Sequence, residues 1–271
     1  MSASRVVSWP GFFNTRDLGG LPTKSGGTTR FGAFFRAADL RFVTGAGWAR
    51  ARDAGVRTVV DLRNADEIRS AAEPRTAQAG SAQFTADTAG PATPAGIDRL
   101  EVPLDDIDDL PFWQHVNRAG LNGTPLYYPV FLRQKAGRCA AVVKAIAHAD
   151  PGGVLFHCGA GRDRTGLVTL LLLALADVEP RAIAADYAMS AEALVPLVAA
   201  MGTDDQGPII RAALAKHGTT AEAAVLATLD GFDAGPYLLA AGVTGGELRA
   251  LRDRLVNPAG PSSSRRPTTP G

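Results

Sequence analysis

A strand, a glycine-rich loop and an apolar helix follow one another in the middle of the chain, and this pattern most constrains the fold. The run "VLFHC" (154–158) is typical of a buried strand, and "GLVTLLLLALADV" (166–178) is typical of a buried helix. A loop containing Gly159 and Gly161 joins them. Strands that alternate with helices build α/β folds with a mainly parallel sheet, where ligands bind at the carboxyl ends of the strands. We therefore predict an α/β fold, with helices flanking the sheet and a functional loop directly after this strand.

Other segments fit the same architecture. The β-branched run "VRTVVDLR" (56–63) predicts a second buried strand, and residues 99–104 predict another. Helices are expected at 45–55 and 131–149, and residues 191–256 are expected to be mainly helical.

The chain length favours one large domain. We expect residues 1–257 to form it, beginning with an irregular β segment in the first forty residues. Residues 105–130 mix acidic, aromatic, Gly and Pro residues, which favours short helices and loops that could lie over the site as a lid. The connection at 74–97 is expected to have weak structure, and the tail at 258–271 is expected to be disordered because it is rich in Pro, Ser and Thr.

Composition excludes several classes of function. The formal net charge is +1, from 28 basic and 27 acidic residues, so we expect no nucleic-acid partner, and any anion site must be local. Cys139 and Cys158 cannot form a disulfide framework, and without a nearby His/Cys cluster we expect no metal and no cofactor. The N-terminus lacks a secretory signal and residues 166–178 are too few to span a bilayer. We expect a cytoplasmic protein without an integral membrane segment.

The loop from Cys158 to Arg164 has the residue types of an anion-binding site. A loop that runs from a strand into a helix presents backbone N–H groups to an anion, and the helix N-terminus adds partial positive charge. Arg164 can curl back over the loop and bind two phosphate oxygens with its planar guanidinium. The same field stabilises a thiolate, since a cysteine at a helix N-terminus beside a cation titrates at roughly pH 3.5–7.5. A thiolate beneath a phosphate site indicates nucleophilic attack on phosphorus.

The order His157, Cys158, five residues, Arg164 and Thr165 resembles the signature of the cysteine-dependent phosphatases. The stretch "HCGAGRDRTG" is similar to the HCxAGKDRTG loop of the atypical bacterial protein-tyrosine phosphatases, some of which also hydrolyse phosphoinositides. The resemblance covers roughly residues 12–256. Its other segments are "NTRDLGG" (14–20), "FFRAADL" (34–40), "VRTVVDLRNADE" (56–67) and "AIAADYAMS" (182–190).

The resemblance implies roles for four residues. Cys158 would be the nucleophile and form a cysteinyl-phosphate, and Arg164 would bind phosphate and stabilise the transition state. Thr165 would hydrogen-bond the departing thiolate, and His157 would orient the loop from behind. The residues expected to bind the phosphate or line its site are Gly159, Ala160, Gly161, Arg162, Asp61, Arg63 and Arg16. Position 162 is Arg where the family usually has Lys, which puts any preference for lipid headgroups in doubt.

A general acid must protonate the leaving oxygen, and the sequence leaves its identity open. Asp163 lies inside the loop, and the resembling family implicates the aspartate at this place. Asp61 ends a predicted strand and would face the pocket with Arg63 near it, whereas Asp105 and Asp106 open the possible lid.

Three arginines outside the loop also have alternative interpretations. Arg16 could line the site or simply pair with Asp17 and fix the N-terminal segment. Arg36 could likewise line the site or belong to a surface ion pair, and the same alternatives hold for Arg63.

These observations predict a phosphomonoester hydrolase, first of all a protein-tyrosine phosphatase that acts through a cysteinyl-phosphate and has possible dual specificity. A phosphotyrosine-containing protein would be the substrate; the alternative is a phosphoinositide phosphatase. A rhodanese-like sulfurtransferase would share a thiolate in a backbone nest but would not need Arg164 and Thr165. A non-catalytic phosphate-binding module would not need the cysteine. The family also permits export without a classical signal peptide.

Overall fold

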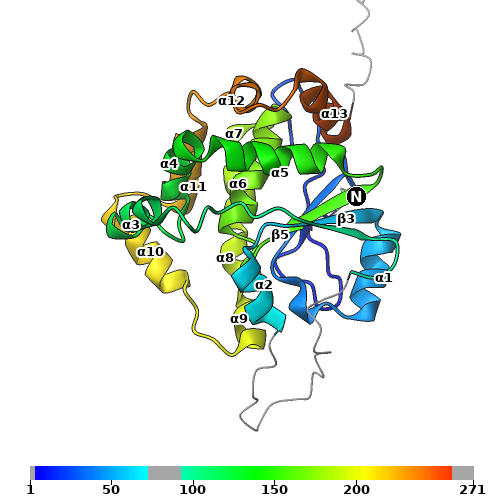
Figure 1. Ribbon diagram of the computed structural model, residues 1–271, viewed down its shortest axis with the longest axis horizontal. Helices are drawn as coiled ribbons and strands as arrows, with labels where there is room; N and C mark the ends of the chain where they lie inside the picture. The colour runs from blue at the N-terminus through cyan, green and yellow to red at the C-terminus, as the bar shows by residue number, and fades with distance from the viewer. Residues whose placement is uncertain (1–3, 73–92, 258–271) are drawn as a thin grey trace, which may run out of the picture.

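The computed structural model describes residues 4–72 and 93–257, which share one five-stranded sheet flanked by helices (Figure 1). The sheet order is β1-β2-β5-β3-β4; β1 is antiparallel to β2, and every other neighbouring pair is parallel. The α/β prediction with a mainly parallel sheet is confirmed. The strands are β1 (Arg16–Asp17), β2 (Phe34–Ala37), β3 (Val56–Asp61), β4 (Asp98–Glu101) and β5 (Gly153–His157).

Helices occupy most of the remaining described chain, and 3₁₀ turns lie at Leu40–Phe42 and Pro125–Tyr127. The helices are α1 (Gly45–Asp53), α2 (Ala65–Ala72), α3 (Leu110–Arg118), α4 (Tyr128–Gln134), α5 (Ala136–His148), α6 (Asp163–Leu175), α7 (Pro180–Ala188), α8 (Ser190–Ala193), α9 (Val195–Met201), α10 (Gly207–Lys216), α11 (Ala221–Leu229), α12 (Ala234–Ala240) and α13 (Gly245–Leu255).

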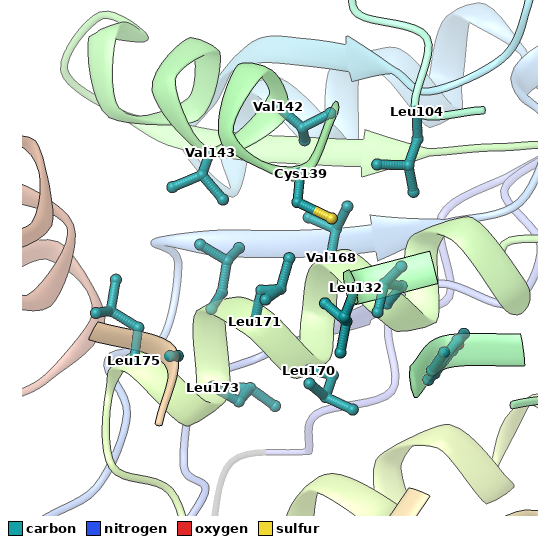
Figure 2. Packing of buried hydrophobic residues seen from close by; sticks show 14 of the residues in the cluster. Leu104, Leu132, Cys139, Val142, Val143, Val168, Leu170, Leu171, Leu173 and Leu175 are labelled. Carbon is teal, nitrogen blue, oxygen red and sulfur yellow. The ribbon is translucent and has the colours of Figure 1, made fainter. Parts of the chain in front are cut away.

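The central strand β5 and the helix α6 that follows it form the middle of the main core. Every residue of β5 is buried, because β2 and β3 flank the strand and helices cover its faces. α6 is apolar on all sides because it contacts α5, α7, α12 and α13 as well as the sheet. Figure 2 shows its leucines packed against Val142 and Val143 of α5. This burial fixes the position of the loop between β5 and α6.

A second, aromatic core covers the opposite face of the sheet. Trp9 packs on Phe12 and Phe35 with ring centroids 5.2 Å apart in each pair, and Phe12 packs edge-on against Trp48 of α1 at 5.4 Å. Leu155 of β5 belongs to this core, whereas its neighbours in β5 belong to the main one. Because successive side chains of β5 point to opposite faces of the sheet, this strand contributes to both cores.

The structure changes some predicted boundaries. The helix expected at 131–149 is interrupted at Lys135, where α4 ends and α5 begins. The strand expected at 99–104 spans only Asp98–Glu101. The tail at 258–271 and most of the connection at 74–97 lie outside the described residues.

One stretch, Pro180–Met201, is long and apolar enough by composition to cross a membrane, with a mean hydropathy of 1.4. This is weak evidence for a membrane span, because core helices pass the same test. The stretch comprises three short helices in succession, α7, α8 and α9. It also contains Asp186, which is fully buried and paired with arginines.

Candidate active site

Cys158 lies at the carboxyl end of β5, where the chain enters the loop that leads into α6. Its side chain is almost completely buried, and its Sγ accepts a hydrogen bond of 3.2 Å from Thr165 Oγ1 in the first turn of α6. Gly161 has φ +67°, and a Cβ there would lie 2.3 Å from the carbonyl oxygen of Ala37. Only glycine therefore allows the loop to pass this closely over β2. The sulfur lies at the N-terminal end of α6, where the helix dipole is positive.

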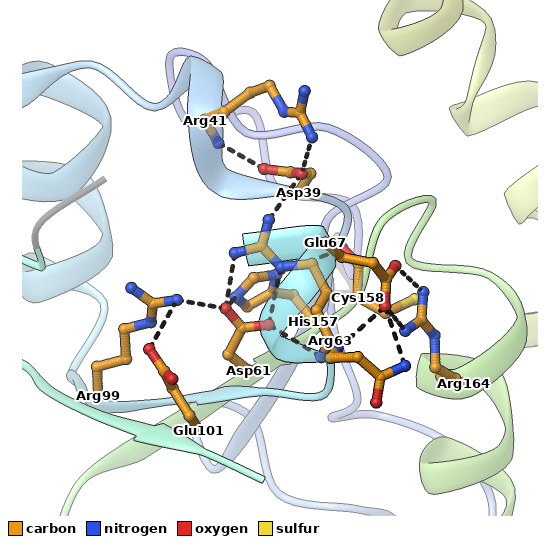
Figure 3. Close-up of polar contacts among 11 residues, drawn as sticks. Asp39, Arg41, Asp61, Arg63, Glu67, Arg99, Glu101, His157, Cys158 and Arg164 are labelled. Atoms are coloured by element: carbon orange, nitrogen blue, oxygen red, sulfur yellow. Dashed lines mark hydrogen bonds and ion pairs between the residues drawn. The ribbon is translucent and has the colours of Figure 1, made fainter. Parts of the chain in front are cut away.

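Arg164 is held by a carboxylate from another element. Its Nη1 and Nη2 donate to the two oxygens of Glu67 in α2, at 2.5 and 2.6 Å (Figure 3). Glu67 is itself fixed, since it accepts the backbone N–H of Asn64 at 3.0 Å. Burial raises the pKa of Glu67, but the hydrogen bonds and charge of Arg164, together with the Asn64 N–H and the charge of Arg63, lower it more, so the net pKa lies below its usual value. The bidentate pair holds the guanidinium in one orientation.

Asp105 faces the same guanidinium from the opposite side of the site. Its Oδ2 lies 3.4 Å from Arg164 Nε, and its buried Oδ1 has no hydrogen-bond partner among the described residues. Burial raises the pKa of Asp105 to about 6, although Arg164 opposes this effect. Asp105 is therefore the carboxyl group of the site that most readily carries a proton near neutral pH.

A pocket of about 420 Å³ opens between these groups. The segment 105–130, predicted as a possible lid, supplies about half of its lining, and Arg164 lies at its base. The residues that line it are Asn64, Asp66, Glu67, Asp105, Ile107, Trp113, Asn122, Gly123, Tyr127, Asp163 and Arg164.

Asp61 and Arg63 lie behind the loop and not in this pocket. Asp61 is completely buried and accepts hydrogen bonds from Arg63 at 2.7 and 2.9 Å and from Arg99 at 2.6 Å. Burial raises its pKa, but Arg63 and the neighbouring His157 lower it more, so the net pKa is far below normal. Arg63 also donates to Asp39 at 2.9 Å. A permanently ionised carboxylate without access to the pocket does not fit a general acid, and the expectation that Asp61 and Arg63 face the site is not met.

His157 is the last residue of β5 and is 1% exposed. Its Nε2 lies 3.5 Å from Asp61 Oδ2, and its Nδ1 lies 3.4 Å from the carbonyl oxygen of Cys158. Burial lowers the pKa of His157 below its usual value despite the attraction of Asp61. The neutral ring can orient the loop through these contacts.

The other candidate acids are engaged with cations. The carboxylate of Asp163 accepts from Arg162 Nε and Nη2, both at 3.1 Å, and from the Tyr187 hydroxyl at 3.2 Å. Asp106 pairs with Lys135 at 3.0 Å and with Arg138 at 2.8 Å. The hydrogen bonds from Lys135 and Arg138 lower the pKa of Asp106, in contrast to the raised pKa of Asp105.

The comparison with known proteins agrees with this geometry. The family model described as "Tyrosine phosphatase family" matches residues 7–257. The chain belongs to this family. The resemblance that the sequence carries is thereby confirmed.

Two relatives and one solved structure illustrate the similarity. The chain is 30% identical over 220 residues to the "Triple specificity protein phosphatase PtpB" of Mycobacterium tuberculosis, a match that covers 71% of each protein. It is 32% identical over 165 residues to a "Tyrosine-protein phosphatase" of Nostoc commune, covering 60% of this chain and 49% of that protein. The structure of P. aeruginosa TpbA aligns with 77% of this chain and 85% of its own, at 17% identity and a TM-score of 0.30, too low to inform the fold.

In this member of the tyrosine phosphatase family, Arg16 and Arg36 lie beneath the loop and not in the pocket. Arg16 is 1% exposed and Arg36 is 0% exposed, and both pair with Asp186 of α7. Arg16 does not pair with Asp17, whose carboxylate instead accepts backbone N–H groups. The expectation that Arg16 lines the phosphate site is therefore not met.

The sequence pattern did not single out Glu67, Asp186 or Asn14, although all three contact site residues. Each lies inside a segment that resembles the family, so membership of those segments was the only available signal. Their partners are distant in sequence: Glu67 meets Arg164, and Asn14 meets the loop carbonyls of residues 160 and 161.

Proposed function

We propose that this member of the family is a protein-tyrosine phosphatase that hydrolyses phosphotyrosine through a cysteinyl-phosphate on Cys158. One observation carries the proposal: Cys158, at the end of β5, receives a hydrogen bond from Thr165, and the pocket beside it holds Arg164 and Asp105. A nucleophile beside a pocket that contains a phosphate ligand and a proton donor supports this proposal.

The first step transfers the phosphoryl group to sulfur. The Cys158 thiolate forms a bond to phosphorus as the bond from phosphorus to the tyrosine oxygen breaks. Arg164 and the loop N–H groups bind the equatorial oxygens, where charge is stabilised in the transition state. Asp105 gives its proton to the departing tyrosine oxygen.

The second step hydrolyses the cysteinyl-phosphate. A water gives a proton to the ionised Asp105 and attacks phosphorus, and the bond from sulfur to phosphorus breaks. Thr165 Oγ1 already donates to the sulfur at 3.2 Å, so it stabilises the thiolate that leaves. No metal ion takes part in either step, so we expect full activity in the presence of a chelator.

Asp105 is the proposed general acid because burial raises its pKa to about 6 and because it lines the pocket beside Arg164. Replacing Asp105 by Asn should lower kcat/KM for phenyl phosphate by roughly 10²- to 10⁴-fold, and much less for an ester of an acidic phenol. Steady-state kinetics with both esters measure the difference. The matched control is Asp163→Asn, where both esters should lose activity to a similar extent. Equal losses on both esters in Asp105→Asn would reject the assignment.

The substrate class is tested with a panel of phosphotyrosine peptide, phosphoserine peptide and phosphoinositides. Cys158→Ser should abolish turnover of every substrate while it still binds phosphate. The relative named as a triple specificity phosphatase supports activity beyond phosphotyrosine. Turnover by Cys158→Ser at the wild-type rate would refute the mechanism, and a thiosulfate-dependent persulfide on Cys158 would support the sulfurtransferase alternative.

A further inference from the structure

A buried polar network lies directly beneath the phosphate loop. It consists of Asn14, Arg16 in β1, Arg36 in β2 and Asp186 in α7. The exposed fractions of these residues are 4%, 1%, 0% and 0%, so the network has no contact with the pocket. The mechanism described above does not use any of the four. These residues nevertheless lie against the side of the loop that faces away from the pocket, because Asn14 and Arg36 contact the loop carbonyls.

The network binds two consecutive carbonyl groups of the loop. Arg36 Nη2 donates to the carbonyl oxygen of Gly161 at 2.7 Å. Asn14 Nδ2 donates to the same oxygen at 3.1 Å and to the carbonyl oxygen of Ala160 at 3.0 Å. These two carbonyls are therefore fixed on the side of the loop that faces the sheet.

The direction of these carbonyls matters for an anion site. A peptide unit presents its N–H and its C=O on opposite sides, so a carbonyl held toward the sheet turns the N–H of its own peptide unit the other way. A carbonyl that rotated toward the pocket would place a partial negative charge against the phosphate. Donors behind the loop thus favour the arrangement that binds an oxyanion.

The members of the network also hold one another in place. Asp186 accepts from Arg16 Nε at 3.0 Å and from Arg36 Nη1 at 2.6 Å. Arg16 Nη1 donates to Asn14 Oδ1 at 2.6 Å, which orients the Asn14 amide so that its N–H groups face the loop. Asn14 has φ +48°, a left-handed conformation that Asn tolerates better than most residues. Each donor to the loop therefore has a partner that fixes its orientation.

The network carries an excess of positive charge. Arg5, Arg16 and Arg36 surround the single carboxylate of Asp186. Burial, together with the charge of Arg36, lowers the pKa of Arg16 to about 10, so its guanidinium stays charged at neutral pH. In a buried setting this excess charge favours an anion on the other side of the loop.

We propose that Asn14, Arg16, Arg36 and Asp186 are positioning residues, which hold the carbonyls of Ala160 and Gly161 away from the pocket and so form the anion-binding loop before substrate arrives. The proposal rests on the proposed function only in taking the bound anion to be a phosphate. It also gives a physical reason why the segments 14–20, 34–40 and 182–190 occur together with the loop at 158–164.

The variant Asn14→Gly tests this proposal with little change to the backbone, because glycine adopts a positive φ without strain. It removes the two hydrogen bonds that Asn14 donates to the loop carbonyls and the acceptor for Arg16, while Arg36 still donates to Gly161. We expect the inhibition constant for orthovanadate, a phosphate-like anion, to rise about tenfold, since two buried hydrogen bonds that orient the loop are lost. The pH profile of Cys158 alkylation by iodoacetamide should shift to higher pH, and phosphate should protect the thiol less. Asn14→Asp keeps the acceptor for Arg16 but not the donors, so it should behave in the same way.

Asp17→Asn is the matched control, because Asp17 is also buried next to Arg16 but bonds Gly19 and Gly32, not the loop. Its vanadate inhibition and alkylation profile should stay at wild-type values even where its thermal midpoint falls. The proposal is overturned if Asn14→Gly binds vanadate as the wild type does, or if Asp17→Asn shows equal losses at equal stability. If the wild type hydrolyses no phosphate ester, the proposed function fails; protection of Cys158 by phosphate still tests the positioning role on its own.

Discussion

Among single residues of the site, Asp105 has the least complete set of partners. Its side chain is 15% exposed and its Oδ1 is unpartnered among the described residues. Burial raises its pKa to about 6 from a model-compound value of 3.8, although Arg164 opposes the shift. The native protein therefore binds this proton more tightly than the unfolded chain does, and stability from this group is lost as the pH rises from about 4 through about 6.

Replacing Asp105 by Asn removes this titration. Relative to the wild type, the variant should therefore gain stability between pH 4 and pH 7, on the order of 2 kcal/mol for a shift of this size. Urea denaturation at a series of pH values measures it. The exposed Asp108→Asn variant is the control, and its difference from the wild type should not depend on pH in this way. A stability difference between Asp105→Asn and the wild type that is constant over this range would contradict the assigned pKa.

Residues of the loop could be predicted from the sequence because their geometry is local. Cys158 directly follows β5, and Arg164 and Thr165 lie in the first turn of α6, so their spacing alone places them together. The identity of the acid could not be predicted in this way. Asp61 ends β3 and Asp105 follows β4. Only tertiary packing decides that Asp61 meets Arg63 and Arg99, whereas Asp105 meets Arg164 and its Oδ1 has no hydrogen-bond partner among the described residues.

At the scale of elements, α2 connects the sheet to Arg164, the residue proposed to bind phosphate. Glu67 accepts from Asn64 at the start of this helix and binds Arg164 in α6 with both oxygens. Glu67→Gln keeps an oxygen for the Asn64 N–H but removes the charge and one acceptor for the guanidinium. We expect the orthovanadate inhibition constant to rise roughly tenfold, because Arg164 is then free to adopt other rotamers.

A decrease in the orthovanadate inhibition constant of Glu67→Gln would be equally informative about the role of α2. If Glu67 competes with phosphate for Arg164, Glu67→Gln would bind vanadate more tightly than the wild type, and the positioning role would be refuted. Asp66→Asn is the matched control on the same helix, since Asp66 also lines the pocket, whereas Arg164 forms its ion pairs with Glu67 and Asp105. It should change the vanadate inhibition constant only slightly.

The elements differ in how far the sequence predicted them. α6 was predicted because an apolar run of this length has few alternatives to a buried helix. The interruption between α4 and α5 was not predicted, because lysine at position 135 has a high intrinsic helix propensity. The structure shows Lys135 bonded to Asp106 and Asp109, which lie almost thirty residues earlier in the chain. Contacts at such separations leave no periodic signal in the sequence.

At the scale of the whole molecule, the junction of α4 and α5 holds the segment that carries Asp105. Lys135 Nζ lies 3.0 Å from Asp106 and 2.5 Å from Asp109, the residue that caps α3, and it packs over the ring of Phe112. Lys135 is only 8% exposed, so this contact is screened less than a surface pair. It links the main core to the wall of the pocket.

Lys135→Met should therefore loosen the segment before α3 while it keeps most of the apolar packing of the side chain. Because Asp105 directly precedes Asp106, we expect kcat/KM for phenyl phosphate to fall about tenfold, whereas an ester of an acidic phenol, which needs little proton donation, should lose less than threefold. Arg138→Met is the control: Arg138 also pairs with Asp106 but is 41% exposed, and such pairs contribute little. Parallel losses on both esters in Lys135→Met would mean that the junction supports the phosphate loop and does not position the acid.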